Sequence, residues 1–371
     1  MKVLMVDIFL PENNYALELA CELTKITDLT LFCREDVGDI DSLVKNKRKL
    51  YRGHRPKLIA IYEYLRGLHW LKKEFKLDYD VVHAQAFKFA WLEVPMYIKV
   101  KKRGKVLVHT VHNVLPHEVK NRDRETYQKI YEASDVLVVH NERTKNQLMS
   151  EFAVDEDKIA VIPHGIYGDM VPNVTRASDK MRFLMFGIIR EYKGLDILLR
   201  AISQIPEAVR DRCEFVIAGK QDLKLDPFDY VALAKELGIE DCVKFDLRRI
   251  EDEELPELFA NADTCVFPYR EIYGSGALLM AYTYQKPVIA SNVPAFVEET
   301  ENGKTGLLFE NENPQSLAEA IERFVNLDDQ QRKGYSEYIA KLVKEKYNWA
   351  ASAKKTAEAY EKVLQNRRSG K

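Results

Sequence analysis

The stretch FLMFGIIREYKGLDILLRAI, residues 183–202, decides the fold class of this chain. It opens with Phe183–Phe186, a short apolar run typical of a buried strand. It continues into Gly194–Ser203, where apolar residues recur at helical spacing. The turn between them carries two cations, Arg190 and Lys193. Because strand–turn–helix is the repeating unit of parallel α/β proteins, the stretch predicts a domain of that class.

The same alternation extends in both directions along the chain. Predicted strands are Val3–Ile8, Leu29–Cys33, Tyr79–His83, Lys105–Val111, Asp135–His140, Ala160–Pro163, Phe183–Phe186, Glu214–Ala218, Val243–Asp246, Thr264–Pro268 and Pro287–Ser291. Helical pattern lies between them, as at Tyr15–Thr24 and Tyr230–Leu237, and dominates from Pro314 to about Gln365. Strands alternating with helices imply parallel sheets with right-handed crossovers. We therefore predict an α/β protein of two doubly wound, Rossmann-like domains that face each other across a cleft.

The proposed boundary is GIYGDMVPNVTRASDK, where apolar periodicity lapses. We predict a first domain over residues 1–165, a linker over 166–180 and a second domain over 181–345. The remaining segment, 346–371, is predicted to be a helix.

Composition limits the classes of function. The chain has 371 residues, a formal charge of −2 and a pI near 6.5, which argues against a globally basic nucleic-acid binder. Its five cysteines are an odd number without a CxxC pair, which favours a reducing compartment and argues against a disulfide framework or a Cys-rich zinc site. No run resembles a signal peptide or a membrane span, so we expect a cytoplasmic protein.

Ligands of doubly wound sheets bind where strands end, so the turns after strands are the candidate sites. The first turn contains Asn13 and Asn14 and lacks the GxGxxG fingerprint. Its helix N-terminus offers backbone N–H groups to an anion, or the asparagines simply cap the turn.

Three histidines and an acid lie at and after the end of the strand Lys105–Val111, in the sequence HTVHNVLPHE. Imidazole and carboxylate are zinc ligands, but the spacing is not HExxH on a helix. Core histidines are a second interpretation. We favour a polar cluster facing the cleft, in which His112 donates to a sugar or phosphate oxygen. Its predicted acceptor-binding residues are Asn113, His117 and Glu118.

Two further turns suit an anionic, hydroxyl-rich ligand. Arg190 and Lys193, near Gly187 and a helix start, form a candidate diphosphate clamp. Later, Gly274-Ser275-Gly276-Ala277 opens a helix, which brings bare amides and the helix dipole together. Glu271 precedes it and could accept from sugar hydroxyls. Glycines that serve only packing are the alternative.

These motifs, in this order, resemble the donor domain of glycosyltransferase family 4. The resemblance is carried by FGIIREYKGLDILLRAI, FVIAG, ADTCVFPY, SGALLMAYTYQKPVIAS and ENGKTGLLF, and by His112–Glu118 in the first half. It implies the GT-B fold, with the last helix crossing back to the first domain. It also implies a retaining transferase that uses a nucleotide-diphospho-sugar and needs no cofactor or essential metal. The sequence leaves UDP and GDP both open.

The resemblance also implies roles for individual residues. Arg190 and Lys193 match the cations that grip the diphosphate, although the usual Arg directly follows the Gly, where this chain has Ile188. Glu271 lies within one residue of the first glutamate of the family's paired-glutamate motif, and Met280 replaces the second, which usually contacts the ribose. The predicted catalytic residues are Glu271, His112, Arg190 and Lys193, and the predicted donor-binding residues are Asn13, Asn14, Gly187, Lys220, Arg248, Tyr273, Gly274, Ser275, Gly276 and Ala277.

A basic tract, KNKRKLYRGHRPK at residues 45–57, precedes an aromatic, amphipathic stretch that runs to Lys73. This combination suits an anionic membrane surface, and a solvated charged loop is the alternative. With the membrane interpretation, we expect peripheral binding through residues 45–73 at the inner face of the cell membrane. The acceptor would be a glycan or lipid-linked sugar in surface polysaccharide or glycolipid synthesis, and no nucleic acid is expected. A sugar-nucleotide epimerase or hydrolase, and a non-catalytic scaffold, remain alternative functions.

Overall fold

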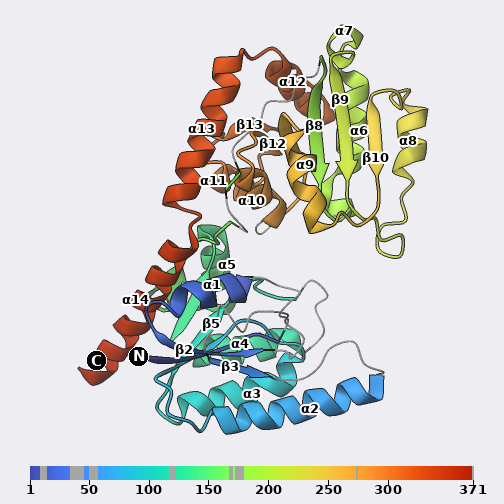
Figure 1. The fold of residues 1–371 in the computed structure, drawn as a ribbon. Coiled ribbons are helices and arrows are strands. Elements are labelled where there is room, and N and C mark those ends of the chain that lie inside the picture. The colour runs from blue at the N-terminus through green and yellow to red at the C-terminus, as the bar shows by residue number, and fades with distance from the viewer. Residues whose placement is uncertain are drawn as a thin grey trace. The chain divides into compact units, whose positions relative to one another are not determined.

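The computed structural model describes residues 1–8, 15–33, 46–49, 57–116, 122–166, 170–171, 179–272 and 275–369, with the backbone alone at 46–49 and 57. The chain divides into two compact units (Figure 1). Unit 1 comprises Met1–Gly165 and Lys346–Lys371, and unit 2 comprises Ile166–Glu345. Unit 1 therefore contains both ends of the chain, and its last helix is separated from the rest by all of unit 2.

Unit 1 contains a seven-stranded parallel sheet in the order β3-β2-β1-β4-β5-β6-β7. Its strands are β1 Lys2–Val6, β2 Asp28–Cys33, β3 Asn46–Lys49, β4 Val81–Ala84, β5 Val106–Thr110, β6 Val136–Val139 and β7 Ile159–Val161. The central strands are buried on both faces, which is why they read as continuous apolar runs. The strand order reverses at β1, so its carboxyl end and that of β4 mark the topological switch point.

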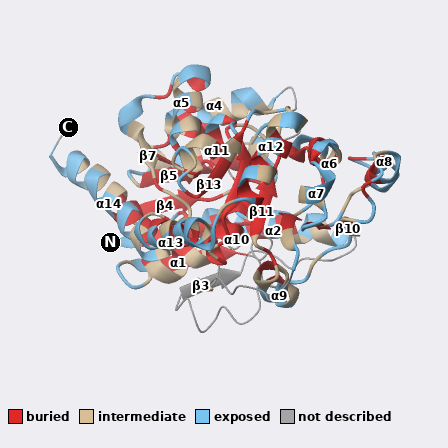
Figure 2. Ribbon diagram, turned by 90° about the horizontal axis from the view of Figure 1, so that it is seen from above, coloured by how far each residue is buried: buried red, intermediate tan, exposed pale blue. Residues whose placement is uncertain are grey.

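Helices cover both faces of this sheet, and each face has its own apolar core. The helices are α1 Tyr15–Leu23, α2 Lys57–Glu74, α3 Ala90–Lys101, α4 Asp123–Ala133, α5 Glu142–Phe152 and α14 Trp349–Arg368. The last of these packs against α1, and its Ala353, Ala357 and Tyr360 complete the core on that face. In Figure 2 buried residues, in red, lie mostly in the interior, and exposed residues, in pale blue, lie mainly on the outer helices.

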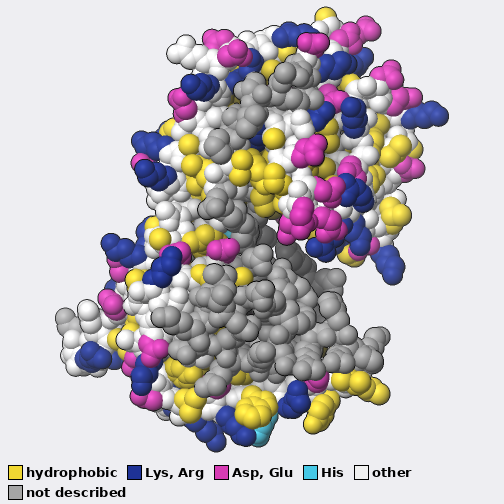
Figure 3. Space-filling view, viewed as in Figure 1, with side chains coloured by type: hydrophobic (Ala, Val, Ile, Leu, Met, Phe, Trp, Pro, Cys, Tyr) yellow, Lys and Arg dark blue, Asp and Glu magenta, His cyan; other side chains and the backbone are white. Residues whose placement is uncertain are grey.

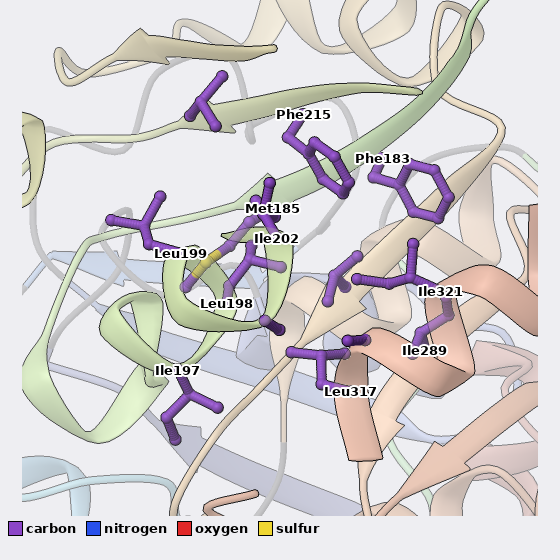
Figure 4. Close-up of a cluster of buried hydrophobic side chains, with 14 of the residues drawn as sticks. Phe183, Met185, Ile197, Leu198, Leu199, Ile202, Phe215, Ile289, Leu317 and Ile321 are labelled. Atoms are coloured by element: carbon purple, nitrogen blue, oxygen red, sulfur yellow. The ribbon is translucent and has the colours of Figure 1, made fainter. Parts of the chain in front are cut away.

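Unit 2 repeats the design with a six-stranded parallel sheet in the order β10-β9-β8-β11-β12-β13. Its strands are β8 Met181–Phe186, β9 Cys213–Ala218, β10 Val243–Asp246, β11 Thr264–Phe267, β12 Val288–Ser291 and β13 Gly306–Phe309. Its helices are α6 Leu195–Gln204, α7 Glu207–Arg210, α8 Tyr230–Glu236, α9 Leu255–Ala260, α10 Gly276–Thr283, α11 Pro294–Glu299, α12 Pro314–Val325 and α13 Asp329–Glu345. Figure 4 shows the core between α6, α12 and the sheet, where Phe183 stacks on Phe215 at 5.0 Å between ring centroids. The switch point here lies between β8 and β11.

The predicted fold class is confirmed: both sheets are parallel and doubly wound. Two strands were not predicted. One is β3, whose Asn46–Lys49 lies in the basic tract and pairs with β2 through its backbone, so no apolar pattern marks it. The other is β13, a four-residue strand that begins at Gly306. The helical tail is three helices, and asparagine N-caps at Asn313 and Asn348 start α12 and α14.

Candidate functional site

The loops after β8 and β11 meet at the switch point of unit 2. The first loop passes through a single 3₁₀ turn, Glu191–Lys193, and ends at Gly194, which has φ +67°. A Cβ built on Gly194 would lie 2.0 Å from the carbonyl oxygen of Pro268. The two loops therefore touch through backbone atoms, and glycine alone fits at this contact.

Lys193 is a buried cation in this loop. Its Nζ lies 5.3 Å from the centre of the Tyr269 ring, and a Cβ on Gly187 would lie 2.8 Å from the same Nζ. Burial lowers the pKa of Lys193 to about 8, with the neighbouring charge of Arg190 as a smaller cause. Among the residues that the structure describes, no carboxylate pairs with Lys193. A buried ammonium without an acidic partner is costly, so this position is prepared for an anionic ligand.

The N-terminus of α10 lies beside the same glycine. The built Cβ of Gly187 would be 3.9 Å from the Cβ of Ala277, in the first turn of the helix. Ser275 is the N-cap, and its hydroxyl accepts from the backbone N–H of Leu278 at 3.1 Å. The space above Gly276 is open, since nothing lies within 4 Å of its built Cβ. The structure thus brings Gly187, Lys193 and the start of α10 together.

Two other predicted donor-site residues lie at this end of the sheet with different surroundings. Lys220 is exposed and follows Gly219, whose built Cβ would be 2.1 Å from the carbonyl oxygen of Gly187. Arg248 forms ion pairs with Asp246 at 3.0 Å and with Glu254, and these raise its pKa further. Its guanidinium is therefore already held by carboxylates.

Glu271 is exposed, and Met280 is half-buried on α10. The predicted residues Asn13, Asn14, His117, Glu118, Tyr273 and Gly274 lie outside the described residues. Sequence reasoning missed Arg270, which holds the second loop by donating to Asp196 at 2.7 Å and to the carbonyl oxygen of Glu191 at 2.7 Å. Its partners are distant in sequence, so a local motif could not reveal them.

Unit 1 has a pocket of about 110 Å³ at the carboxyl ends of β4 and β5. Its polar lining comprises Gln85, His109, Thr110, His112, Asn113 and Tyr127, with Phe87 as the largest apolar side chain. Two of the predicted acceptor-domain residues, His112 and Asn113, are therefore in the pocket. Sequence reasoning missed Gln85 and Thr110, although Gln85 comes soon after the predicted strand Tyr79–His83 and Thr110 lies near the end of Lys105–Val111.

The pocket's histidines are held neutral. Burial lowers the pKa of His109 to about 4, and its Nδ1–H donates to the carbonyl oxygen of Ala84 at 3.1 Å. Burial and the neighbouring His140 hold the pKa of His112 well below its usual value. Within the described part of the chain, His112 Nε2 and Gln85 Oε1 are buried without a hydrogen-bond partner. Such atoms are paired in most proteins, so the pocket is suited to a neutral ligand with hydroxyl groups.

Each doubly wound unit thus presents polar groups at its switch point, one a cationic loop with helix amides and the other a neutral pocket. Two such units with a last helix returning to the first define the GT-B class of glycosyltransferases.

Comparison with known families agrees. The model for glycosyl transferases group 1 matches residues 171–342, and that for Glycosyltransferase Family 4 matches residues 13–167. The chain therefore belongs to glycosyltransferase family 4, a family of enzymes.

Its relatives include the D-inositol 3-phosphate glycosyltransferase of Corynebacterium glutamicum, 25% identical over 95% of this chain and 92% of that protein. The enzyme of the same name from Corynebacterium aurimucosum is 28% identical over 79% of this chain and 74% of its own. Among solved structures, sucrose-phosphate synthase from Thermosynechococcus elongatus superposes with a TM-score of 0.73 at 19% identity, covering 98% of this chain and 99% of that one. Anabaena HepE in complex with UDP gives 0.72 at 17%, covering 98% and 100%. These structures show the shared fold.

Among the described residues, no helix is long and apolar enough to cross a membrane. No group of three His, Cys, Asp or Glu side chains among them is placed to hold a metal ion. His117 and Glu118 of the predicted histidine–acid cluster lie outside those residues.

Proposed function

We propose that this protein transfers a sugar from a nucleotide-diphospho-sugar to an acceptor hydroxyl with retention of anomeric configuration. The observation that carries the proposal is Lys193, a buried cation that has no acidic partner among the described residues and lies beside the N-terminus of α10. A diphosphate would supply the missing negative charge. UDP- and GDP-sugars are the candidate donors, and HepE, which shares the fold, has been solved in complexes with UDP and UDP-glucose.

In this proposal the cationic loop acts on the leaving group. When the sugar–phosphate bond breaks, negative charge grows on the diphosphate oxygens. In the proposal, Lys193, Arg190 and backbone amides at the start of α10 stabilise that charge, because cations and dipoles held in place by the fold need little reorganisation during the reaction. A diphosphate oxygen takes the acceptor proton, so no separate protein base is required. The family resemblance implies that no metal is needed, and turnover unchanged by EDTA would support this.

The acceptor hydroxyl is proposed to enter the unit 1 pocket. His112 Nε2 and Gln85 Oε1 offer one buried hydrogen-bonding atom each, and Asn113 lies in the lining. A hydroxylated ring, as found in a glycan or a glycolipid head, satisfies such atoms. Several relatives are named for an inositol phosphate, which is also a ring polyol. We place the reaction in the synthesis of a surface polysaccharide or glycolipid.

A thermal-shift titration with UDP, GDP and ADP tests the donor site. A nucleotide at one hundred times its dissociation constant stabilises the fold by about 2.7 kcal/mol. We expect one of them to shift the wild type selectively and the shift to disappear in Lys193→Met, which keeps the volume and removes the charge. Lys224→Met, at an exposed lysine in the same unit, is the matched control and should retain the shift.

Activity then separates the alternatives. Sugar transfer to an added acceptor supports the transferase. Donor cleavage with no transfer would indicate an epimerase or hydrolase. A cooperatively folded sample that binds none of the nucleotides would favour a non-catalytic scaffold. Met280, which stands where the family usually has a ribose-contacting glutamate, is the feature that suggests this alternative.

A further inference from the structure

The outer face of α2 exposes large apolar side chains. Leu58 is 83% exposed, Tyr62 66% and Leu65 51%, and Ile59, Ile61 and Trp70 are also exposed. The opposite side of the helix, with Tyr64, Leu68 and Leu71, is buried in the core of unit 1. The helix is therefore apolar on both sides, and only one side is covered within the described structure.

The second half of the same outer face is cationic. Arg66, Lys72 and Lys73 are exposed there beside His69, and Lys73 Nζ lies 4.8 Å from the centre of the Trp70 ring. The two carboxylates of the helix, Glu63 and Glu74, are only partly exposed. Figure 3 shows hydrophobic, Lys and Arg side chains along the edge of the molecule over α2.

A second apolar group adjoins this face at the start of α3. Phe89 and Trp91 are exposed, at 46% and 60%, and the Phe89 ring meets the Tyr64 ring of α2 edge to face at 5.4 Å between centroids. Together, α2's outer face and these two rings form what we call the α2 patch.

From these observations we infer that the α2 patch docks the protein on an anionic lipid surface. Leucine, isoleucine and aromatic side chains enter the headgroup and upper acyl region, while lysine and arginine at the flank contact anionic headgroups. A protein partner would need matching acidic side chains, whereas an anionic bilayer supplies charge and apolar depth together. The basic tract at 45–57 lies mostly outside the described residues.

The patch is joined to the proposed acceptor pocket by one short loop. Residues 85–87 line the pocket and residues 88–89 lead directly to the patch. Buried Glu93 on α3 secures this loop by accepting from the backbone N–H of Lys88 at 2.9 Å and of Phe89 at 2.8 Å, and from the Tyr64 hydroxyl at 2.5 Å. If the proposed function holds, the acceptor is an amphiphile whose head reaches the pocket while its tail stays in the lipid.

Vesicle co-sedimentation of the full chain tests the docking without donor or acceptor, so its outcome is independent of the proposed function. The probes are vesicles of phosphatidylglycerol with phosphatidylcholine in equal parts, and vesicles of phosphatidylcholine alone. We expect binding to the first, weaker binding to the second, and loss of binding at high salt. A blue shift of tryptophan fluorescence on binding should diminish in Trp70→Phe.

Variants locate the surface. We expect the partition coefficient to fall at least tenfold in the α2 triple variant Leu58→Gln/Tyr62→Gln/Leu65→Gln. It should fall roughly fivefold per lysine in Lys72→Gln/Lys73→Gln. The control Leu223→Gln/Leu225→Gln/Val231→Gln changes three comparably exposed residues of unit 2 and should bind like the wild type. Equal loss in the control, or no binding by the wild type, would overturn the inference. Sedimentation velocity gives a further test. If the wild type dimerised with rising concentration and the α2 triple variant did not, the patch would bind a second copy of the chain, and the inference would be overturned.

Discussion

The two units share a topology and differ in the chemistry at their switch points. All eight histidines and all three tryptophans of the chain belong to unit 1, and unit 2 has neither residue. Unit 1 lines its pocket with neutral imidazole, amide and hydroxyl groups. Unit 2 uses a buried lysine and backbone amides. One parallel α/β scaffold thus presents either neutral polar groups or a buried cation at its strand ends, according to a few loop residues.

The largest predicted consequence is a difference in acid stability between the units. Burial lowers the pKa of His83 and of His164 to about 3 and that of His109 to about 4. The unfolded chain therefore binds protons between pH 6.5 and these values that the folded chain does not bind. Stability of unit 1 is intact above pH 6.5 and falls below it, by roughly 2 kcal/mol per histidine at pH 5.

Tryptophan fluorescence measures this loss selectively, because every tryptophan lies in unit 1. As the pH is lowered, the fluorescence transition should be complete at a higher pH than the far-ultraviolet circular dichroism transition, because circular dichroism reports the unfolding of both units. Coincident transitions at every pH would mean that the histidines do not set the stability difference.

The next prediction concerns a glycine pair in unit 2. Gly194 and Gly238 have nearly the same φ, +67° and +64°. An alanine would therefore lose about the same stability at both positions from adopting the left-handed backbone conformation. A Cβ meets Pro268 O at 2.0 Å in the first case and nothing within 4 Å in the second. We expect Gly238→Ala to cost about 1 kcal/mol and Gly194→Ala about 3 kcal/mol or more, with loss of nucleotide binding. Denaturant unfolding followed by circular dichroism measures both, and equal costs would show that the contact of the two loops is not tight.

The smallest expected effect is a difference in pH dependence between the two substrates. Lys193 has a pKa of about 8, so the free enzyme loses this charge as pH rises through that value. The donor kcat/KM should then fall by up to about tenfold per pH unit. The kcat/KM for the acceptor should not change from pH 6.5 to 9, because His112 is neutral throughout this range. Steady-state kinetics with each substrate varied separately would check this, and a donor profile flat through pH 9 would remove Lys193 from the donor site.

Sequence pattern revealed the parts of the fold that bury apolar surface. Val3, Phe183 and their neighbours form continuous apolar runs, and each is found in a central strand. It did not reveal β3, which is polar and pairs through its backbone at the sheet edge. Nor did it reveal β13, which begins at a glycine and contains only three apolar residues.

The candidate site divides in the same way. Gly187, Lys193 and Ala277 follow strands in local motifs, and they come together as the parallel arrangement requires. The ion pairs that hold Arg248 and the contacts of Arg270 with Asp196 depend on loop geometry that spacing does not encode. The unfilled hydrogen-bonding capacity of Gln85 and His112 is likewise a property of the folded pocket.

The return of α14 to unit 1 has a consequence for the order of events on the ribosome. Tyr360 donates to or accepts from buried His83 Nδ1 at 2.6 Å, Ser352 donates to the carbonyl oxygen of Pro163 at 2.7 Å, and Arg367 pairs with Asp135 at 2.8 Å. None of these contacts exists until unit 2, which is continuous in sequence, has been translated. The first unit to be synthesised is therefore the last to be completed, and a chain truncated before α14 would contain all of unit 2 together with a unit 1 that has one core face open.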